Sequence, residues 1–432
     1  MTTMTIPVPA SAEQTRAYAK ITWRILPFLL FCYLAAYIDR VNIGFAKLQM
    51  ASDLGFSDAA YGLGAGIFFI GYSIFEVPSN LMLHKVGARR WIARILITWG
   101  LVSACFGFVQ TETHFYILRF LLGVAEAGFA PGALLYLTYW FPATRRSRAN
   151  SFMFLAIPLA GIIGAPLSGL IMEKMAGVNG WSGWRWMFVL EAAPALLAGL
   201  LTLKLLPNRP ADVDWLTAED KRVVLADLAE DDAGRTEHAS IRMFLADRRL
   251  WLLCAIYFMV VMGQYAITFW LPTIIKNAGA STPLINGMLT SVPFFAAMVA
   301  MIGLSISADR HRERRWHLIV PMVTGAIALT IASFFPHNMA VSLVLMSLAS
   351  AGMLASTVMF WSLPPAFLGG VWAAAGIGGI NAIGNLAGFA SPYLIGSLVS
   401  VSGDLRLGLY AIAASVFIGA ALVLRVPKSA NR

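Results

Sequence analysis

The sequence predicts an all-α polytopic membrane protein whose twelve transmembrane helices form two pseudosymmetric six-helix bundles. Of its 432 residues, 59% are hydrophobic and only 12% are charged, and the mean hydropathy is +0.72. Soluble proteins carry about 25% charged residues. Apolar runs of the roughly 20 residues that a membrane span needs recur along the whole chain. Basic residues gather in alternate loops between these runs, and short motifs repeat at a separation of six runs.

Twelve apolar runs, separated by polar or turn-forming breaks, mark the expected spans. They cover about residues 21–44, 59–82, 91–110, 114–140, 149–173, 184–206, 248–275, 285–307, 316–335, 340–361, 372–399 and 406–425. The expected domains are a tail (1–20), an N-terminal bundle (21–206), a linker (207–247), a C-terminal bundle (248–425) and a second tail (426–432). Within the linker, TAEDKRVVLADLAEDD predicts a surface helix. No signal peptide is expected, because the first run is too long and no cleavage site follows it.

The loops that carry basic residues alternate along the chain. They follow the second, fourth and eighth spans, and their members are Lys85, Arg89, Arg90, Arg94, Arg145, Arg146, Arg148, Arg310, Arg312, Arg314 and Arg315. Loops rich in Lys and Arg stay in the cytoplasm, so both termini are expected there. The net charge of +10 therefore reflects membrane topology and does not indicate nucleic-acid binding.

A repeated loop motif supports the two-bundle arrangement. NLMLHKVGARRW follows the second span and SISADRHRERR follows the eighth, and in both a basic residue comes directly after His84 or Asp309. A second repeat places two glycines eight residues apart around a proline; its members are Gly161, Pro166 and Gly169, then Gly388, Pro392 and Gly396. Repeated halves are typical of secondary transporters. The candidate gating residues of the two loops are Lys85, Gly87, Arg89, Arg90, Asp309 and Arg310.

The most informative stretch is YLAAYIDRVNIG, which ends the first span. It places Asp39 and Arg40 where a charge costs at least ~2.5–3.5 kcal/mol, so both are expected to face the bundle interior. Because successive residues turn by about 100°, one helical stripe carries Tyr33, Tyr37, Arg40 and Gly44. The other helices are expected to surround this stripe.

The fourth span holds a second pair of charges. RFLLGVAEAGFAPG places Arg119, Gly123, Glu126 and Ala130 on one helical face inside an apolar run. A purely structural alternative is that the two charged groups form an ion pair with each other or with Asp39.

Neutral polar groups complete the set of candidates. The second span carries Tyr72, Glu76 and Asn80 at spacings of four, which either line a crevice or make a polar contact at the cytoplasmic rim. Glu191 in the sixth span is expected only to bond a neighbouring helix. The second bundle shows no mid-membrane charge, and its candidate ligand-binding residues are Gln264, Tyr265, Trp361, Asn381 and Asn385.

These residue types suit the joint binding of an organic anion and a proton. Arg40 is a permanent cation that can hold a carboxylate through two hydrogen bonds, and Tyr37 lies one turn away. An anion that neutralises Arg40 favours protonation of the nearby acids Asp39 and Glu126, which links the two ligands. Arg119 would hold Glu126 in its unprotonated state. The polar groups of the second bundle would orient the rest of the ligand.

Catalytic motifs are absent from the sequence. No Gly-rich phosphate loop indicates an ATP-driven pump. The six histidines are dispersed, and Cys32, Cys105 and Cys254 offer neither a disulfide framework nor metal-ligand spacing. The protein is therefore expected not to be an enzyme and to need no cofactor, with the proton as its coupling ion.

The whole chain resembles the major facilitator superfamily, and within it the anion:cation symporters. The resemblance lies in YIDRVNIGFA, GYSIFEVPSN, VGARRWIARI and RFLLGVAEAGFAPG, which occur in this order and are most similar to tartrate-, phthalate- and hydroxyphenylacetate-type permeases. It implies alternating access and proton-coupled uptake of an organic anion by a monomer in a bacterial inner membrane. It also implies proton-coupling acids at Asp39 and Glu126 and substrate-binding residues at Arg40, Tyr37 and Tyr72. The first gating loop departs from the family pattern at Asn80 and His84.

The leading hypothesis is a proton-coupled symporter for a small carboxylate such as tartrate, phthalate or a hydroxylated aromatic acid. An anion exchanger or uniporter of the same fold is the alternative. A membrane sensor without transport activity is more remote, because the loops are short and form no sizeable soluble domain. The expected partners are the organic anion and the lipid bilayer.

Overall fold

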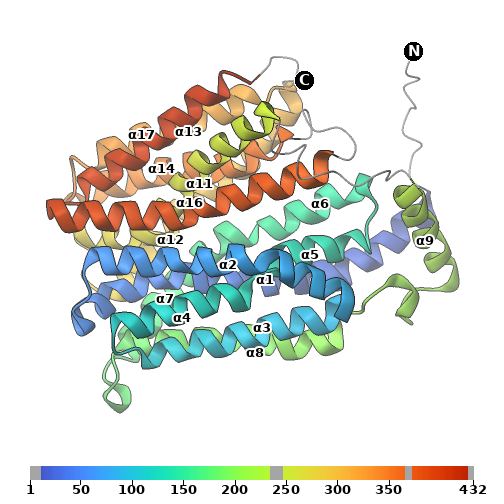
Figure 1. Cartoon of the computed structure of the whole chain (residues 1–432), viewed down its shortest axis with the longest axis horizontal. Coiled ribbons are helices and arrows are strands. Elements are labelled where there is room, and N and C mark those ends of the chain that lie inside the picture. Colours follow the sequence, from blue (N-terminus) through green and yellow to red (C-terminus); the bar gives the residue numbers. More distant parts are fainter. Residues whose placement is uncertain (1–10, 234–246, 365–371, 427–432) are drawn as a thin grey trace.

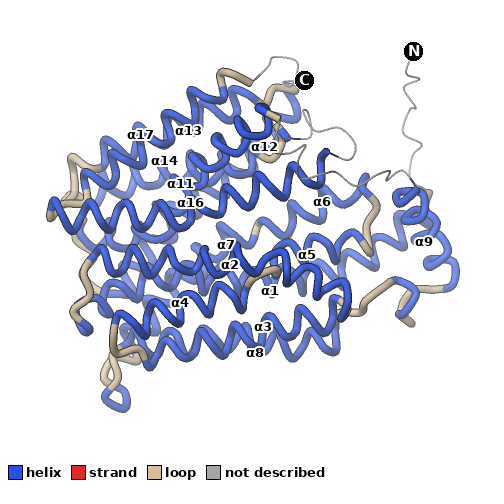
Figure 2. Tube along the Cα trace, viewed as in Figure 1, coloured by secondary structure: helices blue, strands red, loops and turns tan. Residues whose placement is uncertain are grey.

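The computed structural model describes residues 11–233, 247–364 and 372–426, and within them twelve helices are long and apolar enough to cross a membrane. The prediction of twelve spans is therefore confirmed. All regular structure in these three segments is helical (Figure 2). Parts of the expected tails and linker, residues 1–10, 234–246 and 427–432, lie outside the described residues.

The helices follow one another along the chain with short connections. The first half contains α1 (Ala12–Leu54), α2 (Asp58–Val86), α3 (Ala88–Cys105), α4 (Glu112–Glu126), α5 (Phe129–Thr138), α6 (Ala143–Phe154), α7 (Ala156–Lys174) and α8 (Gly183–Leu205). Helix α9 (Ala218–Ala233) lies in the linker. The second half contains α11 (Arg248–Asn277), α12 (Pro283–His311), α13 (Arg315–Ala332), α14 (Met339–Phe360), α16 (Trp372–Ser402) and α17 (Arg406–Val423).

The two halves lie side by side, the first half in blue to green and the second in yellow to red (Figure 1). We call the side on which α1 begins and α9 lies the terminal face, at the right of Figure 1. We call the side of the α1–α2 turn at Gly55 the opposite face. The closest helix pairs between the halves are α7 with α12 and α2 with α16, and α1 also packs against α11.

Glycines let the halves approach closely near the opposite face. A Cβ atom on Gly62 of α2 would clash with the Pro392 carbonyl of α16, and one on Gly169 of α7 would clash with the Pro283 carbonyl of α12. Hydrogen bonds add to this contact, because Ala59 N donates to Ser400 Oγ at 2.9 Å. The repeated glycines of the sequence, of which Gly169 is one, thus allow the two halves to pack closely.

The first helix is longer than the expected span, with 43 residues from Ala12 to Leu54. Ser11 and Gln14 form a capping box, so the helix starts well before residue 21. It ends at Gly55, whose φ of 71° is in the left-handed region that favours glycine.

The fourth span consists of two helices with a break between them. The sequence analysis expected one continuous helix and missed this break. Helix α4 ends at Glu126, Ala127 is extended, and Gly128 has a φ of 84° before α5 begins. Pro131 favours the break, because its ring would clash with the carbonyl of residue 127 in a continuous helix, and Gly128 supplies the left-handed backbone conformation. The expectation that Ala130 shares a face with Glu126 is therefore wrong.

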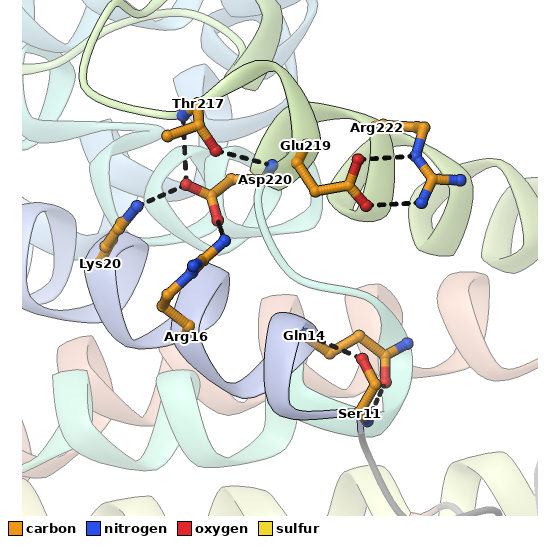
Figure 3. A network of polar contacts seen from close by, with 8 residues as sticks. All are labelled: Ser11, Gln14, Arg16, Lys20, Thr217, Glu219, Asp220 and Arg222. Carbon is orange, nitrogen blue, oxygen red and sulfur yellow. Dashed lines mark hydrogen bonds and ion pairs between the residues drawn. The ribbon is translucent and has the colours of Figure 1, made fainter.

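Helix α9 is fastened to the first half at the terminal face (Figure 3). Asp220 is buried and accepts hydrogen bonds from Lys20 Nζ at 2.5 Å and Arg16 Nη2 at 3.4 Å. Burial alone would raise the pKa of Asp220, but hydrogen bonds from Lys20 and Thr217 outweigh it and lower the pKa to about 2. At the other end of α9, Asp231 pairs with Arg146 of α6 at 2.8 Å. The expected surface helix of the linker thus packs on α1 and α6.

Candidate functional site

An ion pair lies at the centre of the first half. Arg40 of α1 donates to Glu126 Oε1 of α4 from Nε at 3.0 Å and from Nη2 at 2.5 Å. The Glu126 side chain is 2% exposed and that of Arg40 is 11% exposed. The second oxygen, Glu126 Oε2, is buried without a hydrogen-bond partner among the described residues. The pair is therefore held through one oxygen only.

The break in the fourth span positions Glu126. As the last residue of α4, it lies at the negative end of the helix dipole, which disfavours a carboxylate by about 0.3–1 kcal/mol. The Arg40 guanidinium compensates for this. A carboxylate in such a position would be costly without its cation.

Aromatic rings surround the Arg40 guanidinium. Its central carbon lies 5.0 Å from the ring centre of Tyr37 and 5.4 Å from those of Tyr72 and Phe68. The structure thus brings together Arg40, Tyr37 and Tyr72, as the sequence reading expected. Phe68 was missed because it carries no polar atom, although it lies one turn before Tyr72.

Asp39 points away from Arg40 toward α3. It accepts hydrogen bonds from Trp99 Nε1, from Ser103 Oγ at 3.0 Å and from Asn42 Nδ2 at 3.1 Å, and it is 3% exposed. Adjacent helical residues differ by about 100° in direction, so Asp39 and Arg40 face different neighbours. All three donors were missed as partners of Asp39. Sequence periodicity does not show that α3 faces Asp39 with Trp99 and Ser103, whereas the spacing of three residues to Asn42 was a local signal.

Arg119 forms no ion pair with Glu126 or Asp39, so the purely structural alternative given for the two charges of the fourth span is wrong. Its Nε donates to the carbonyl of Gly64 at 3.1 Å and its Nη2 to that of Ala65 at 2.9 Å. Two helical turns separate it from Glu126, whereas Arg40 on a facing helix reaches Glu126 directly. Arg119 therefore acts on Glu126 only through space.

Each candidate residue of the second half contacts either the first half or another polar side chain of its own half. Gln264 Oε1 accepts from Thr357 Oγ1 at 2.8 Å, and Trp361 Nε1 donates to Tyr257 OH at 3.2 Å. The ring of Tyr265 packs on Phe69 of α2, with the centroids 4.6 Å apart. Tyr265 is also near enough to Arg40 for an electrostatic interaction.

A hydrogen bond between α16 and α2 also joins the two halves. Asn381 Nδ2 of α16 donates to Glu76 Oε1 of α2 at 3.3 Å, and Asn385 is within reach of the same carboxyl. Glu76 therefore lies at the surface between the two halves. The sequence analysis had left two alternatives for this residue, a crevice lining or a polar contact at the cytoplasmic rim.

The candidate gating residues lie at the terminal face. Lys85, Arg89, Arg90, Asp309 and Arg310 are exposed, and Gly87 turns the chain between α2 and α3 with a φ of 89°. The backbone N–H of Arg89 donates to Asn208 Oδ1 at 3.1 Å. Asp309 lines a cavity of about 290 Å³ with Arg312 and Arg314. The gating role of these residues stays a prediction.

Twelve spans in two halves, with a cation and acids buried within the first half, define a membrane transporter. Comparisons with known proteins name its family: residues 29–392 match the model of the Major Facilitator Superfamily, and the chain belongs to this family. It is therefore a multi-pass membrane transporter and not an enzyme.

Relatives extend over nearly the whole chain. The chain is 49% identical to the "Putative metabolite transport protein NicT" of Pseudomonas putida, over 96% of this chain and 95% of that protein. It is 46% identical to a "Putative tartrate transporter" of Agrobacterium vitis, over 97% of this chain and 93% of the relative. Among solved structures, a bacterial homolog of the human lysosomal transporter Spinster, in an inward-facing and occupied conformation, matches with a TM-score of 0.74. That match has 17% identity and covers 98% of this chain and 99% of the other, so it supports the fold alone.

Proposed function

We propose that this transporter is a proton-coupled symporter that imports a small organic carboxylate by alternating access. The observation that carries the proposal is the Arg40–Glu126 pair. Arg40 is a partly exposed cation among aromatic rings, and its present partner is a carboxylate held through one oxygen. A substrate carboxylate can compete with Glu126 for the same guanidinium.

Competition for Arg40 links the anion to a proton. When the substrate takes Arg40, Glu126 becomes a buried carboxylate without its cation, and such a group takes up a proton instead of staying charged. Anion and proton therefore bind together, and each increases the affinity for the other. When the anion leaves, Glu126 loses its proton and returns to Arg40. Asp39 is the second proposed proton-coupling acid, and Arg119 assists through its charge.

Other residues would hold the remainder of the ligand. Tyr37 and Tyr72 lie against Arg40 from the first half. From the second half we propose Gln264, Tyr265, Trp361, Asn381 and Asn385. The name of the Agrobacterium vitis relative puts tartrate first among the candidate acids, before phthalate and hydroxyphenylacetate.

We also propose the orientation of the protein in the membrane. The basic loops after α2 and α12 lie on the terminal face, which supports a cytoplasmic location of that face and of both termini. The close glycine contacts lie near the opposite face. The conformation would then be inward-facing, in a monomer in the bacterial inner membrane, with the proton as coupling ion and no cofactor.

Uptake into proteoliposomes tests the proposal. With an acidic outside, radiolabelled tartrate, phthalate or hydroxyphenylacetate should accumulate uphill. Losing the Arg40 hydrogen bonds in Arg40→Ala removes about 1.5–3 kcal/mol, a loss of affinity of roughly 10- to 150-fold. If no carboxylate moves, or if Arg40→Ala transports normally, the proposal fails. Exchange without uphill accumulation would favour the exchanger or uniporter.

A further inference from the structure

A buried carboxyl that the proposed mechanism does not use lies beside Asp39. Glu191 of α8 is 2% exposed, and its Oε1 accepts a hydrogen bond from Ser168 Oγ of α7 at 2.7 Å. Its other oxygen, Oε2, is buried with no hydrogen-bond partner among the described residues. Asn42 is within hydrogen-bonding reach of this carboxyl and also donates to Asp39 Oδ1. The Asn42 amide therefore stands between two acids.

These two acids lie near each other, and among the described residues neither forms an ion pair with a cation. Helix α8 packs against α1, α3 and α7. Of the charged groups that the structure describes on these helices, Asp39 is the one that interacts electrostatically with Glu191. Asp39 also interacts electrostatically with Glu126 and Arg119. Arg40 is paired with Glu126 and Arg119 donates to backbone carbonyls, so neither guanidinium forms an ion pair with Asp39 or Glu191. Two buried carboxylates without a counter-charge are very costly, and one proton removes most of that cost.

The hydrogen bonds indicate which acid carries the proton. Asp39 accepts three hydrogen bonds from neutral donors, whereas Glu191 accepts one from Ser168. Hydrogen bonds to a carboxylate favour its ionised form. We propose that Asp39 and Glu191 form one buried site that holds a single proton, with Glu191 the protonated member in this conformation and Asn42 the group between them.

The Asn42 amide explains why the two acids would not be protonated together. An amide has a donor end and an acceptor end. The donor end serves ionised Asp39, and the acceptor, Asn42 Oδ1, is buried without a partner among the described residues. Protonated Glu191 can donate to that oxygen. When the proton passes from Glu191 Oε2 to Asp39, a flipped amide accepts from Asp39 and donates to the Glu191 carboxylate.

This inference deepens the proposed function and rests on it for its role in transport. Asp39 would receive its proton from Glu191, through the core of the first half. Glu191 would then be a proton-holding residue that never touches the substrate. Its protonation state can be measured without any transport, so the two proposals can fail separately.

Infrared difference spectroscopy of the purified protein tests the protonation state. At neutral pH the native protein should show the carbonyl band of a buried protonated carboxyl, and Glu191→Gln should remove it. Glu112→Gln, which changes an exposed acid at the start of α4, should leave it unchanged. Ser168→Ala removes a hydrogen bond to Glu191, so it should keep the band but shift its frequency. This variant tests the assignment of the band to Glu191 if Glu191→Gln does not fold. A native protein without the band, or a band that persists in Glu191→Gln, would overturn the inference.

Exchange and net transport then test the role. In the native protein the rate of gradient-driven uptake should depend on pH through the shared site. Glu191→Gln should shift the pH of half-maximal uptake by about one unit or more while substrate exchange continues, and Glu191→Asp should restore the native profile in part. An unchanged profile in Glu191→Gln contradicts the inference even if the native protein is a symporter. If the native protein shows no gradient-driven uptake, the proposed function fails, and the infrared result still decides where the proton is.

Discussion

Lys47 offers a way to change the balance between the two conformations of the transporter. It lies at the opposite-face end of α1, and its side chain is only 8% exposed. Its ammonium lies 3.7 Å from the ring centre of Trp270 in the second half, and it pairs with Asp58 of the first half at 2.6 Å. The Asp58 pair stays within one half, so the Trp270 contact is the attraction of Lys47 that must break when the halves separate at this face. The exposed Lys276 of the second half repels Lys47 and opposes this attraction in part.

The size of the effect follows from that one contact. A desolvated cation–π contact contributes about 1–2 kcal/mol. Lys47→Met keeps most of the apolar stem and removes the charge, so the ratio of open to closed opposite faces should rise about 5- to 30-fold.

Spin labels can measure this ratio. Cysteines at Val178 and Ser281, in a background without native cysteines, report the distance between the halves at the opposite face. The fraction of long distances should increase in Lys47→Met, and Lys47→Arg should restore the native distribution. Arg406→Met removes an exposed charge whose ion pair with Asp404 stays within the second half, so it should have no effect. A distribution unchanged by Lys47→Met would refute the reasoning.

Three further predictions concern other parts of the structure. Glu126→Gln frees Arg40, so carboxylate affinity measured by calorimetry should rise and lose its pH dependence; a retained pH dependence would contradict the competition. Gly128→Ala puts a side chain at a φ of 84° and against Ser79, so it should lower the free energy of unfolding by at least ~1–2 kcal/mol, seen as a lower Tm; an unchanged Tm would contradict this. The Asp220 pKa of about 2 lies below its ordinary value of 3.8, so the attachment of α9 should be complete above pH 3.8 and be lost as pH falls toward 2. Asp220→Asn should therefore increase hydrogen exchange in α9 at neutral pH, and exchange equal to that of the native protein would argue against the attachment.

Hydropathy and helical periodicity were enough to predict the number of spans and the inward stripe of α1. Tyr37 and Arg40 do lie together, and Gly44 does face the second half, since a Cβ there would lie 3.0 Å from the Phe269 carbonyl. Such patterns predict which side of one helix is buried, because they depend only on the spacing of residues along that helix.

Which side chain of one helix contacts which side chain of another could not be predicted from spacing along the sequence. The sequence analysis considered Arg119 and not Arg40 as a partner of Glu126, and the contact between α1 and α4 that brings Arg40 to Glu126 is visible only in the structure. Two of the three donors to Asp39, Trp99 and Ser103, come from α3, and the partner of Glu76 comes from the other half, so these contacts are long-range. The break after Glu126 did have a local signal in AGFAPG, which the continuous apolar run obscured.

The most direct test of the coupling between anion and proton is the number of protons taken up when a carboxylate binds. The purified protein in a weakly buffered solution with a pH indicator should take up about one proton for each tartrate, or other acid from the uptake panel, that binds. The same measurement on Glu126→Gln should show binding without proton uptake. Carboxylate binding to the native protein with no proton uptake, or equal uptake in Glu126→Gln, would contradict the account.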